Sequence, residues 1–111
     1  MAEPSLTAVF GSNATQDATT LTISKADLAV TGLTPSANNT AESLLIAIML
    51  KFKLVLTDEA RDTNIDQSVA VVAGFSPSIT TRNDNVYLRN TISVEIDRIL
   101  TGAETIDPDN Y

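Results

Sequence analysis

An unbroken run of apolar residues from Leu44 to Leu50 constrains this chain more than any other feature. Asn39 and Glu42 precede it with the spacing of a helix cap followed by a carboxylate at the third helical position, which predicts a helix beginning at about residue 40. A helix that is apolar on nearly every side must be buried on nearly every side. We therefore expect it to lie between a sheet and a second surface. In a chain of 111 residues, we expect another subunit to supply that second surface.

The segment after the apolar run is ambiguous between helix and strand. Residues 51–54 alternate polar and apolar as a strand would, yet a helix could also continue to Ala60 or Arg61. We favour a helix over about residues 40–50 and leave residues 51–57 open between the two structures. Residues 58–64 are expected to form a polar connection.

The second half of the chain has β character. Residues 69–75 and 79–82 are rich in β-branched residues, and Asn83, Asp84 and Asn85 between strands indicate a turn. From residue 86 to residue 97 apolar and polar residues alternate, which predicts strands with one buried and one solvated face. The apolar members of this series are Val86, Leu88, Ile92, Val94 and Ile96.

These patterns predict an α+β fold, with one mostly apolar central helix packed on a small antiparallel β-sheet and an extended N-terminal arm. Residues 1–20 carry too little apolar surface to order themselves alone, so we expect an arm that orders against a neighbouring subunit, or else a disordered tail. Residues 21–101 are expected to form a single domain that begins with a strand candidate at residues 21–24. Residues 102–111 are expected to form a C-terminal tail.

The composition removes most catalytic chemistry. The chain has no Cys and no His, which excludes thiolate nucleophiles, disulfides and the usual neutral-pH proton shuttle. Two carboxylate pairs, Asp58 with Glu59 and Glu95 with Asp97, could in principle act on a sugar, but three Phe, two Tyr and no Trp offer little to line a cleft. We read these pairs as solvated surface. We expect no enzyme activity, no catalytic residues, no cofactor and no metal site.

The charge balance limits the partners. A formal net charge of -7 without any cluster of basic residues argues against binding nucleic acid or an anionic membrane surface. The longest apolar stretch is too short to span a bilayer, which takes about 20 residues. The first ten residues lack the pattern of a secretory signal, so we expect a soluble protein made in a cytoplasm.

The remaining candidates for function are contact residues. Arginine is enriched in subunit interfaces, so the arginines of the β region are expected to make contacts there, unless they pair with Glu95 and Asp97 across the sheet. The residues expected at interfaces are Val9, Phe10, Leu45, Ile48, Met49, Phe52, Arg82, Arg89 and Arg98.

Three features together resemble the small structural proteins of tailed bacteriophage particles. They are the Ala/Ser/Thr/Asn-rich N-terminal arm, the small acidic Cys-free domain and the sequence TISKADLAVTGLTPSANNTAESLLIAIML. The resemblance implies a virion structural protein, made in the host cytoplasm, that works as a homo-oligomer with other virion proteins. Both a capsid cement or decoration role and a neck, tail or baseplate role stay open, as does the copy number. The alternative is a cytoplasmic accessory module that binds one cellular protein.

Overall fold

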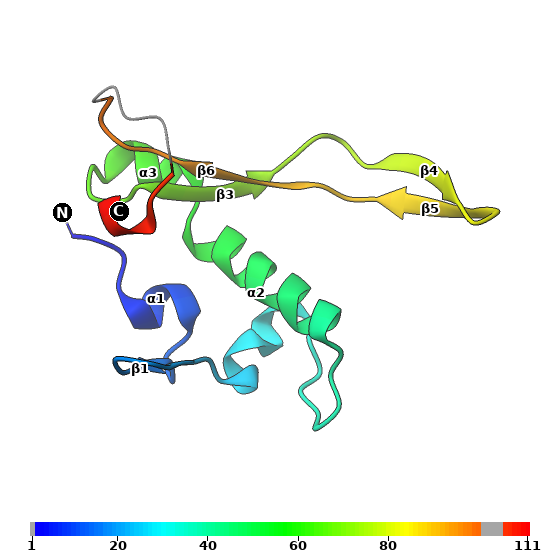
Figure 1. Cartoon of the computed structure of the whole chain (residues 1–111), viewed down its shortest axis with the longest axis horizontal. Helices are drawn as coiled ribbons and strands as arrows, with labels where there is room; N and C mark the ends of the chain where they lie inside the picture. The colour runs from blue at the N-terminus through cyan, green and yellow to red at the C-terminus, as the bar shows by residue number, and fades with distance from the viewer. Residues whose placement is uncertain (1, 101–105) are drawn as a thin grey trace.

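The structure, a computed structural model, describes residues 2–100 and 106–111. The expected boundary between domain and tail, at residues 101 and 102, lies outside the described residues. Helices and small antiparallel sheets are both present, which confirms the α+β class (Figure 1). The elements are, in chain order, α1 (Leu6–Phe10), β1 (Thr15–Gln16), β2 (Leu21–Thr22), η1 (Lys25–Thr31), α2 (Ala41–Val55), α3 (Asp58–Thr63), β3 (Val69–Ala73), β4 (Ser78–Arg82), β5 (Asn85–Arg89), β6 (Ile92–Ile96) and η2 (Pro108–Asn110).

The apolar run lies in helix α2, but its cap differs from the expectation. Thr40 caps the helix, because its hydroxyl accepts a hydrogen bond from the Ser43 amide at 3.1 Å. The prediction that Asn39 is the cap is wrong. Its side chain instead closes the preceding loop, accepting from the Ser36 amide at 2.9 Å and donating to the Thr34 carbonyl at 3.1 Å.

The ambiguous segment after the run is helical as far as Val55. Helical spacing puts Met49, Phe52 and Leu56 on one side of α2, a clustering that a strand would not give. The expected polar connection is wrong over residues 58–63, which form α3. Thr57 caps that helix by accepting a hydrogen bond from the Ala60 amide at 3.1 Å, and two carboxylates in the first turn favour the positive helix end.

An extended arm was expected over residues 1–20, but the N-terminal segment is not extended throughout. Residues 6–10 form α1, because Ser5 caps the turn by accepting from the Ala8 amide at 3.1 Å. The ring of Phe10 then meets that of Phe52 edge to face, with centroids 5.4 Å apart. The strand expected at residues 21–24 is confirmed only for Leu21–Thr22, which pairs with β1.

The β region is one long antiparallel hairpin in two parts (Figure 1). Strand β3 pairs with β6 near the helices, and β4 pairs with β5 at the far end. We call β4, β5 and their turn, residues 78–89, the distal hairpin, and the other described residues up to 100 the body. The expected turn is confirmed, since Asn83 and Asp84 have φ values of 50° and 63°, which suit a two-residue hairpin turn.

The core sits where β3 crosses the helices. Ala70 and Val71 are 0% and 2% exposed, and β3 contacts both α2 and α3. Successive residues of a strand point to opposite faces, so the two helices cover opposite faces of β3. Among the described residues, the buried apolar side chains are Ala14, Leu28, Ala47, Leu56, Ala70 and Val71. This is a small core, and Figure 1 shows the distal hairpin projecting away from it.

The expectation of a continuous buried face from residue 86 to residue 96 is wrong. Val86 and Leu88 are 71% and 67% exposed, and Val94 is 48% exposed. The radius of gyration is 16.4 Å, against about 13 Å for a compact domain of about 100 residues. The pattern gave the faces of the strands correctly, but none of the helices in the described part of the chain lies over the distal strands (Figure 1).

Candidate functional site

The distal hairpin has one apolar and one polar face. Ile79 lies opposite Leu88, and Thr81 lies opposite Val86, so these side chains share one face. Ile79, Leu88 and Val86 are 75%, 67% and 71% exposed, respectively. None of the described residues in β4 and β5 is buried. An isolated two-stranded hairpin is only marginally stable in water, and packing of its apolar face against another element usually stabilises it. In the distal hairpin that face is exposed.

The opposite face carries positive charge. The guanidinium carbon of Arg82 lies 4.5 Å from the ring centroid of Tyr87, in a cation–π contact, and Arg89 lies at the other end of β5. The contact holds Arg82 against its own hairpin. The alternative left open for Arg82, pairing with Glu95 and Asp97, is not what the structure shows, since both carboxylates contact Arg61.

A tight contact between Gly74 and Thr91 lies in the body next to the distal hairpin. The Gly74 amide donates to the Thr91 carbonyl at 2.9 Å, and a Cβ at Gly74 would lie 2.7 Å from the Thr91 Cγ2 atom. Beyond it, Pro77 has no amide hydrogen, and the ladder is interrupted until β4 begins at Ser78. The junction thus separates the covered part of the hairpin from the uncovered part.

The body contains an apolar groove of about 550 Å³ between α1, α2 and the β3–β6 ribbon. Val9 and Phe10 line it from α1, Met49 and Phe52 line it from α2, and Val94 lines it from β6. Its other lining residues are Glu3, Pro4, Ser5, Leu6, Gln16, Leu56, Gln67, Ser68, Val69 and Val71. Val71, a core residue, is among the lining residues, so the groove adjoins the core.

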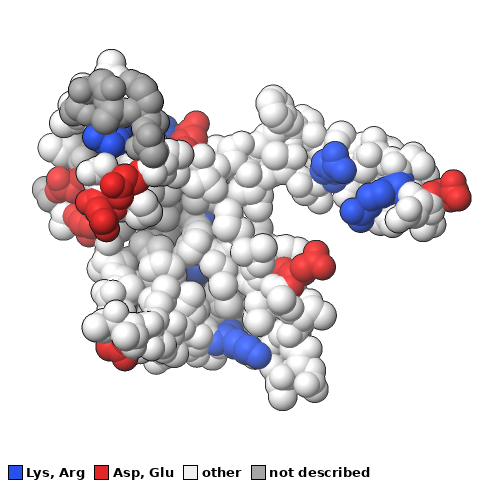
Figure 2. Space-filling model, viewed as in Figure 1, with Lys and Arg blue, Asp and Glu red and all other residues white. Residues whose placement is uncertain are grey.

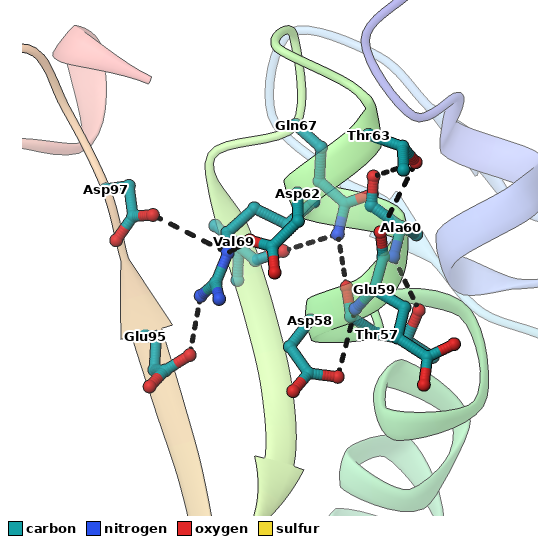
Figure 3. A network of polar contacts seen from close by, with 11 residues as sticks. Thr57, Asp58, Glu59, Ala60, Asp62, Thr63, Gln67, Val69, Glu95 and Asp97 are labelled. Carbon is teal, nitrogen blue, oxygen red and sulfur yellow. Dashed lines mark hydrogen bonds and ion pairs between the residues drawn. The ribbon is translucent and has the colours of Figure 1, made fainter.

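Arg61 on α3 contacts Glu95 and Asp97, one of the two carboxylate pairs considered for catalysis, and also its neighbour Asp62. Its Nη1 donates to Glu95 Oε1 at 2.5 Å, and its Nε lies 3.3 Å from Asp62 Oδ1 and 3.6 Å from Asp97 Oδ2. Figure 3 shows Glu95 and Asp97 reaching from the β6 side toward α3. The hydrogen bond to Glu95 raises the pKa of Arg61 above its ordinary value. The carboxylates therefore tie α3 to β6.

A buried amide continues this network toward α2. Gln67, 6% exposed, donates through Nε2 to the carbonyls of Thr57 at 3.2 Å and Val69 at 2.9 Å (Figure 3). Both bonds are local and hold the turn between α3 and β3. Among residues 2–100 and 106–111, no group of three or more acidic side chains is arranged to hold a metal. In that same part of the chain, no helix is long and apolar enough to cross a membrane.

The structure divides the residues expected at interfaces between two surfaces and three separate positions. Val9, Phe10, Met49 and Phe52 meet in the groove, while Arg82 and Arg89 lie on the distal hairpin. On α2, Leu45 is 59% exposed and Ile48 is half-buried, and neither lines the groove. Arg98 is half-buried after β6, beside a cavity that Arg61 and Asp97 also line. Their role at an interface stays a prediction.

Sequence reasoning missed the exposed apolar face of the distal hairpin and the wall residues Leu6 and Val94. A signal was available for the hairpin, because one long helix and a few short strands cannot cover all the apolar strand positions of the chain. For Leu6, a short segment with a serine cap was the available signal.

Comparisons with protein-family models, with curated proteins and with solved structures find no match to this chain. The functional argument therefore depends on the two surfaces and on the sequence.

Proposed function

We propose that this chain is a non-enzymatic structural subunit that self-assembles, as a virion protein of a tailed phage. The observation that carries the proposal is the uncovered apolar face of the distal hairpin, with Ile79, Val86 and Leu88 each more than two-thirds exposed. Fully burying such a side chain contributes about 1.5–3 kcal/mol, so covering three of them is worth on the order of 5 kcal/mol. That gain is similar to the whole stability of a small domain.

The central helix supports the same proposal. Leu45 and Ile46 are 59% and 57% exposed on α2, and Leu54 is 59% exposed further along it. Leu45 and Ile46 are neighbours, and a contiguous exposed apolar patch usually marks a contact surface. At about 100° per residue, Leu54 lies on the opposite side of α2 from Leu45. A subunit with apolar residues uncovered on both its helix and its hairpin fits repeated contacts in an assembly. The phage setting comes from the sequence resemblance, and docking on the capsid or on the neck or tail is part of the proposal.

The first test is the mass of the purified chain in solution. Sedimentation velocity over a wide range of concentration should give a mass that rises above that of the 11.8 kDa monomer. The Val86→Asp variant should associate less, because a charge on the apolar face of the distal hairpin would have to be buried at the contact. Ala41→Asp is the matched control, since it adds the same charge at an exposed position outside both the distal hairpin and the groove. A monodisperse monomer at the highest concentration contradicts self-assembly.

The second test concerns the virion. The protein should be found in purified particles from a phage whose genome encodes it, and it should be identified there by mass spectrometry. A stable soluble heterodimer with a cellular protein, and its absence from particles, would instead support the alternative of a cytoplasmic binding module.

A further inference from the structure

The distal hairpin and the apolar groove are both uncovered apolar surfaces of this chain. The hairpin presents an uncovered apolar face on a projecting support, and the groove is an open apolar hollow beside the core. Figure 1 shows the hairpin at one end of a molecule 47 Å long, extending away from α1 and α2, which form two walls of the groove. The hairpin therefore does not meet the groove of its own chain.

We propose that the distal hairpin of one copy docks its Ile79, Val86 and Leu88 face into the groove of a second copy. The inference rests on the proposed self-assembly and names the surfaces that make the contact. Apolar layers pack face to face at about 10 Å, and the groove offers an apolar layer in Val9, Phe52 and neighbouring residues. Its volume of about 550 Å³ is large enough to receive several side chains.

Charge points to a second copy as the occupant. The distal hairpin carries Arg82, Arg89 and Asp84, a net charge of +1, so the rest of the chain carries -7 - 1 = -8. Glu3 lies at the groove itself. In Figure 2, basic groups lie on the projecting hairpin behind an acidic tip, while acidic groups gather at the opposite end of the molecule. Arg82 and Arg89 lie on the face opposite Ile79, Val86 and Leu88, so they do not enter the docked contact. Their charge attracts the hairpin to the acidic body of another copy, and such attraction steers association.

The direction of the contact also fits an assembly. A surface on one end of a subunit that complements a different surface elsewhere on the next subunit makes a heterologous contact. Repetition of such a contact closes a ring or continues as a filament. Each body then receives one hairpin and donates one hairpin, so the core of every copy is completed by its neighbour.

Disulfide trapping tests this contact directly, because the chain has no cysteine of its own. The donor variant is Leu88→Cys, on the hairpin. The acceptor variants are Val9→Cys and Val94→Cys, on two walls of the groove, and Ala26→Cys is the matched control at an exposed position outside it. The donor is mixed in equal amounts with each partner, one chain carrying a mass tag, and oxidised with diamide. Circular dichroism first confirms that each variant retains the wild-type fold.

Docking holds the two thiols at a high effective concentration. Mixed disulfides between residue 88 and either groove position should therefore exceed those with the control position by at least about tenfold. The Ile79→Asp substitution in the donor chain should abolish this excess without changing its circular dichroism spectrum. Equal trapping at groove and control positions overturns the inference, and so does a predominance of disulfides between two residues 88, which would show hairpins paired with each other.

The two proposals fail separately. If the wild-type chain associates in sedimentation but the groove positions show no excess, the docking mode is wrong and self-assembly stands. If the wild-type chain is a monomer at every concentration, self-assembly and docking are both wrong.

Discussion

The β3–β6 ribbon and the distal hairpin have similar strand pairing but differ in the burial of their apolar side chains. Both are antiparallel pairs of five-residue strands in the same long hairpin. In the first, Ala70 and Val71 are 0% and 2% exposed, whereas in the second Ile79 and Val86 are 75% and 71% exposed. The strands themselves do not account for the difference. Helices α2 and α3 contact β3, and in Figure 1 no helix lies over β4 and β5.

The comparison shows that alternating apolar and polar residues predict a strand with one apolar face, but do not predict what packs against that face. A strand with one apolar face is stable when something apolar lies over that face, and the pattern is the same whether the cover comes from the same chain or from another one. In this protein, helices cover β3 in the body, whereas the apolar face of the distal hairpin is exposed. We propose that a second copy covers that face.

The largest expected effect follows from placing one charge on each part. Val71→Asp buries an unpaired carboxylate in the core and should lower the free energy of unfolding by about 4 kcal/mol or more, enough to unfold the body. Val86→Asp, on the distal hairpin, should change the free energy of unfolding of the dilute monomer by less than about 0.5 kcal/mol. Urea denaturation followed by circular dichroism measures both values.

The same pair of variants can contradict this difference between the body and the distal hairpin. If Val86→Asp destabilised the dilute monomer as much as Val71→Asp, the distal hairpin would have cover within its own chain. If Val71→Asp had little effect, the body would lack a core where β3 crosses the helices.

A second prediction concerns the contact between residues 11 and 27, which links the N-terminal segment to η1 and which no sequence pattern indicated. Gly11 has φ of 113°, and a Cβ there would lie 2.4 Å from the Asp27 Cβ atom. Asp27 accepts hydrogen bonds from the Asn13 amide at 2.9 Å and from the Asn13 side chain at 3.1 Å. Gly11→Ala should therefore cost about 3 kcal/mol of stability, from the backbone conformation together with the overlap.

Gly32→Ala is the matched control for that prediction. Gly32 also has a positive φ, 101°, but a Cβ there would meet no atom within 4 Å. Its substitution should cost about 1–2 kcal/mol, the backbone contribution alone. Equal losses for the two variants, measured by thermal or urea unfolding, would contradict a packed contact between residues 11 and 27 and would leave the N-terminal segment outside the body.

The sequence predicted the class of the fold and the faces of the strands. It did not predict which apolar faces are buried, because burial depends on the elements that pack against them. The turn at Asn83 and Asp84 was predictable because these residue types tolerate left-handed backbone. The shift of the helix cap from Asn39 to Thr40 was not, because Asn, Thr and Ser all cap well and their neighbours decide among them.

The candidate site was predictable only in part. Val9, Phe10, Met49 and Phe52 were named as contact residues and do share one groove. That α1 would turn to face α2 depends on the edge-to-face contact of Phe10 with Phe52, a tertiary contact that no local pattern encodes. The role of Arg61 was missed for the same reason, since Glu95 is 34 residues away in the chain.

The smallest expected effect is a pH-dependent change in the β1–β2 turn, which is stabilised differently from the distal turn. The distal turn relies on left-handed backbone at Asn83 and Asp84, whereas the β1–β2 turn in the body relies on a carboxylate. Asp17 Oδ1 accepts from the Thr19 and Thr20 amides, both at 2.8 Å. The hydrogen bond from the Thr19 amide is the main cause that lowers the pKa of Asp17 below its ordinary value of 3.8, and the Thr20 amide adds to it.

A depressed pKa in the folded state means that ionised Asp17 stabilises the turn above pH 3.8, and that this contribution is lost as the pH falls through the lowered pKa. An NMR titration of the Thr19 and Thr20 amides should therefore show a midpoint below pH 3.8. Asp17→Asn should remove that transition, because an amide keeps an acceptor oxygen but does not titrate. A midpoint at or above 3.8 would mean that the two amide hydrogen bonds do not hold in solution, and the β1–β2 turn would then owe its shape, like the distal turn, to backbone conformation alone.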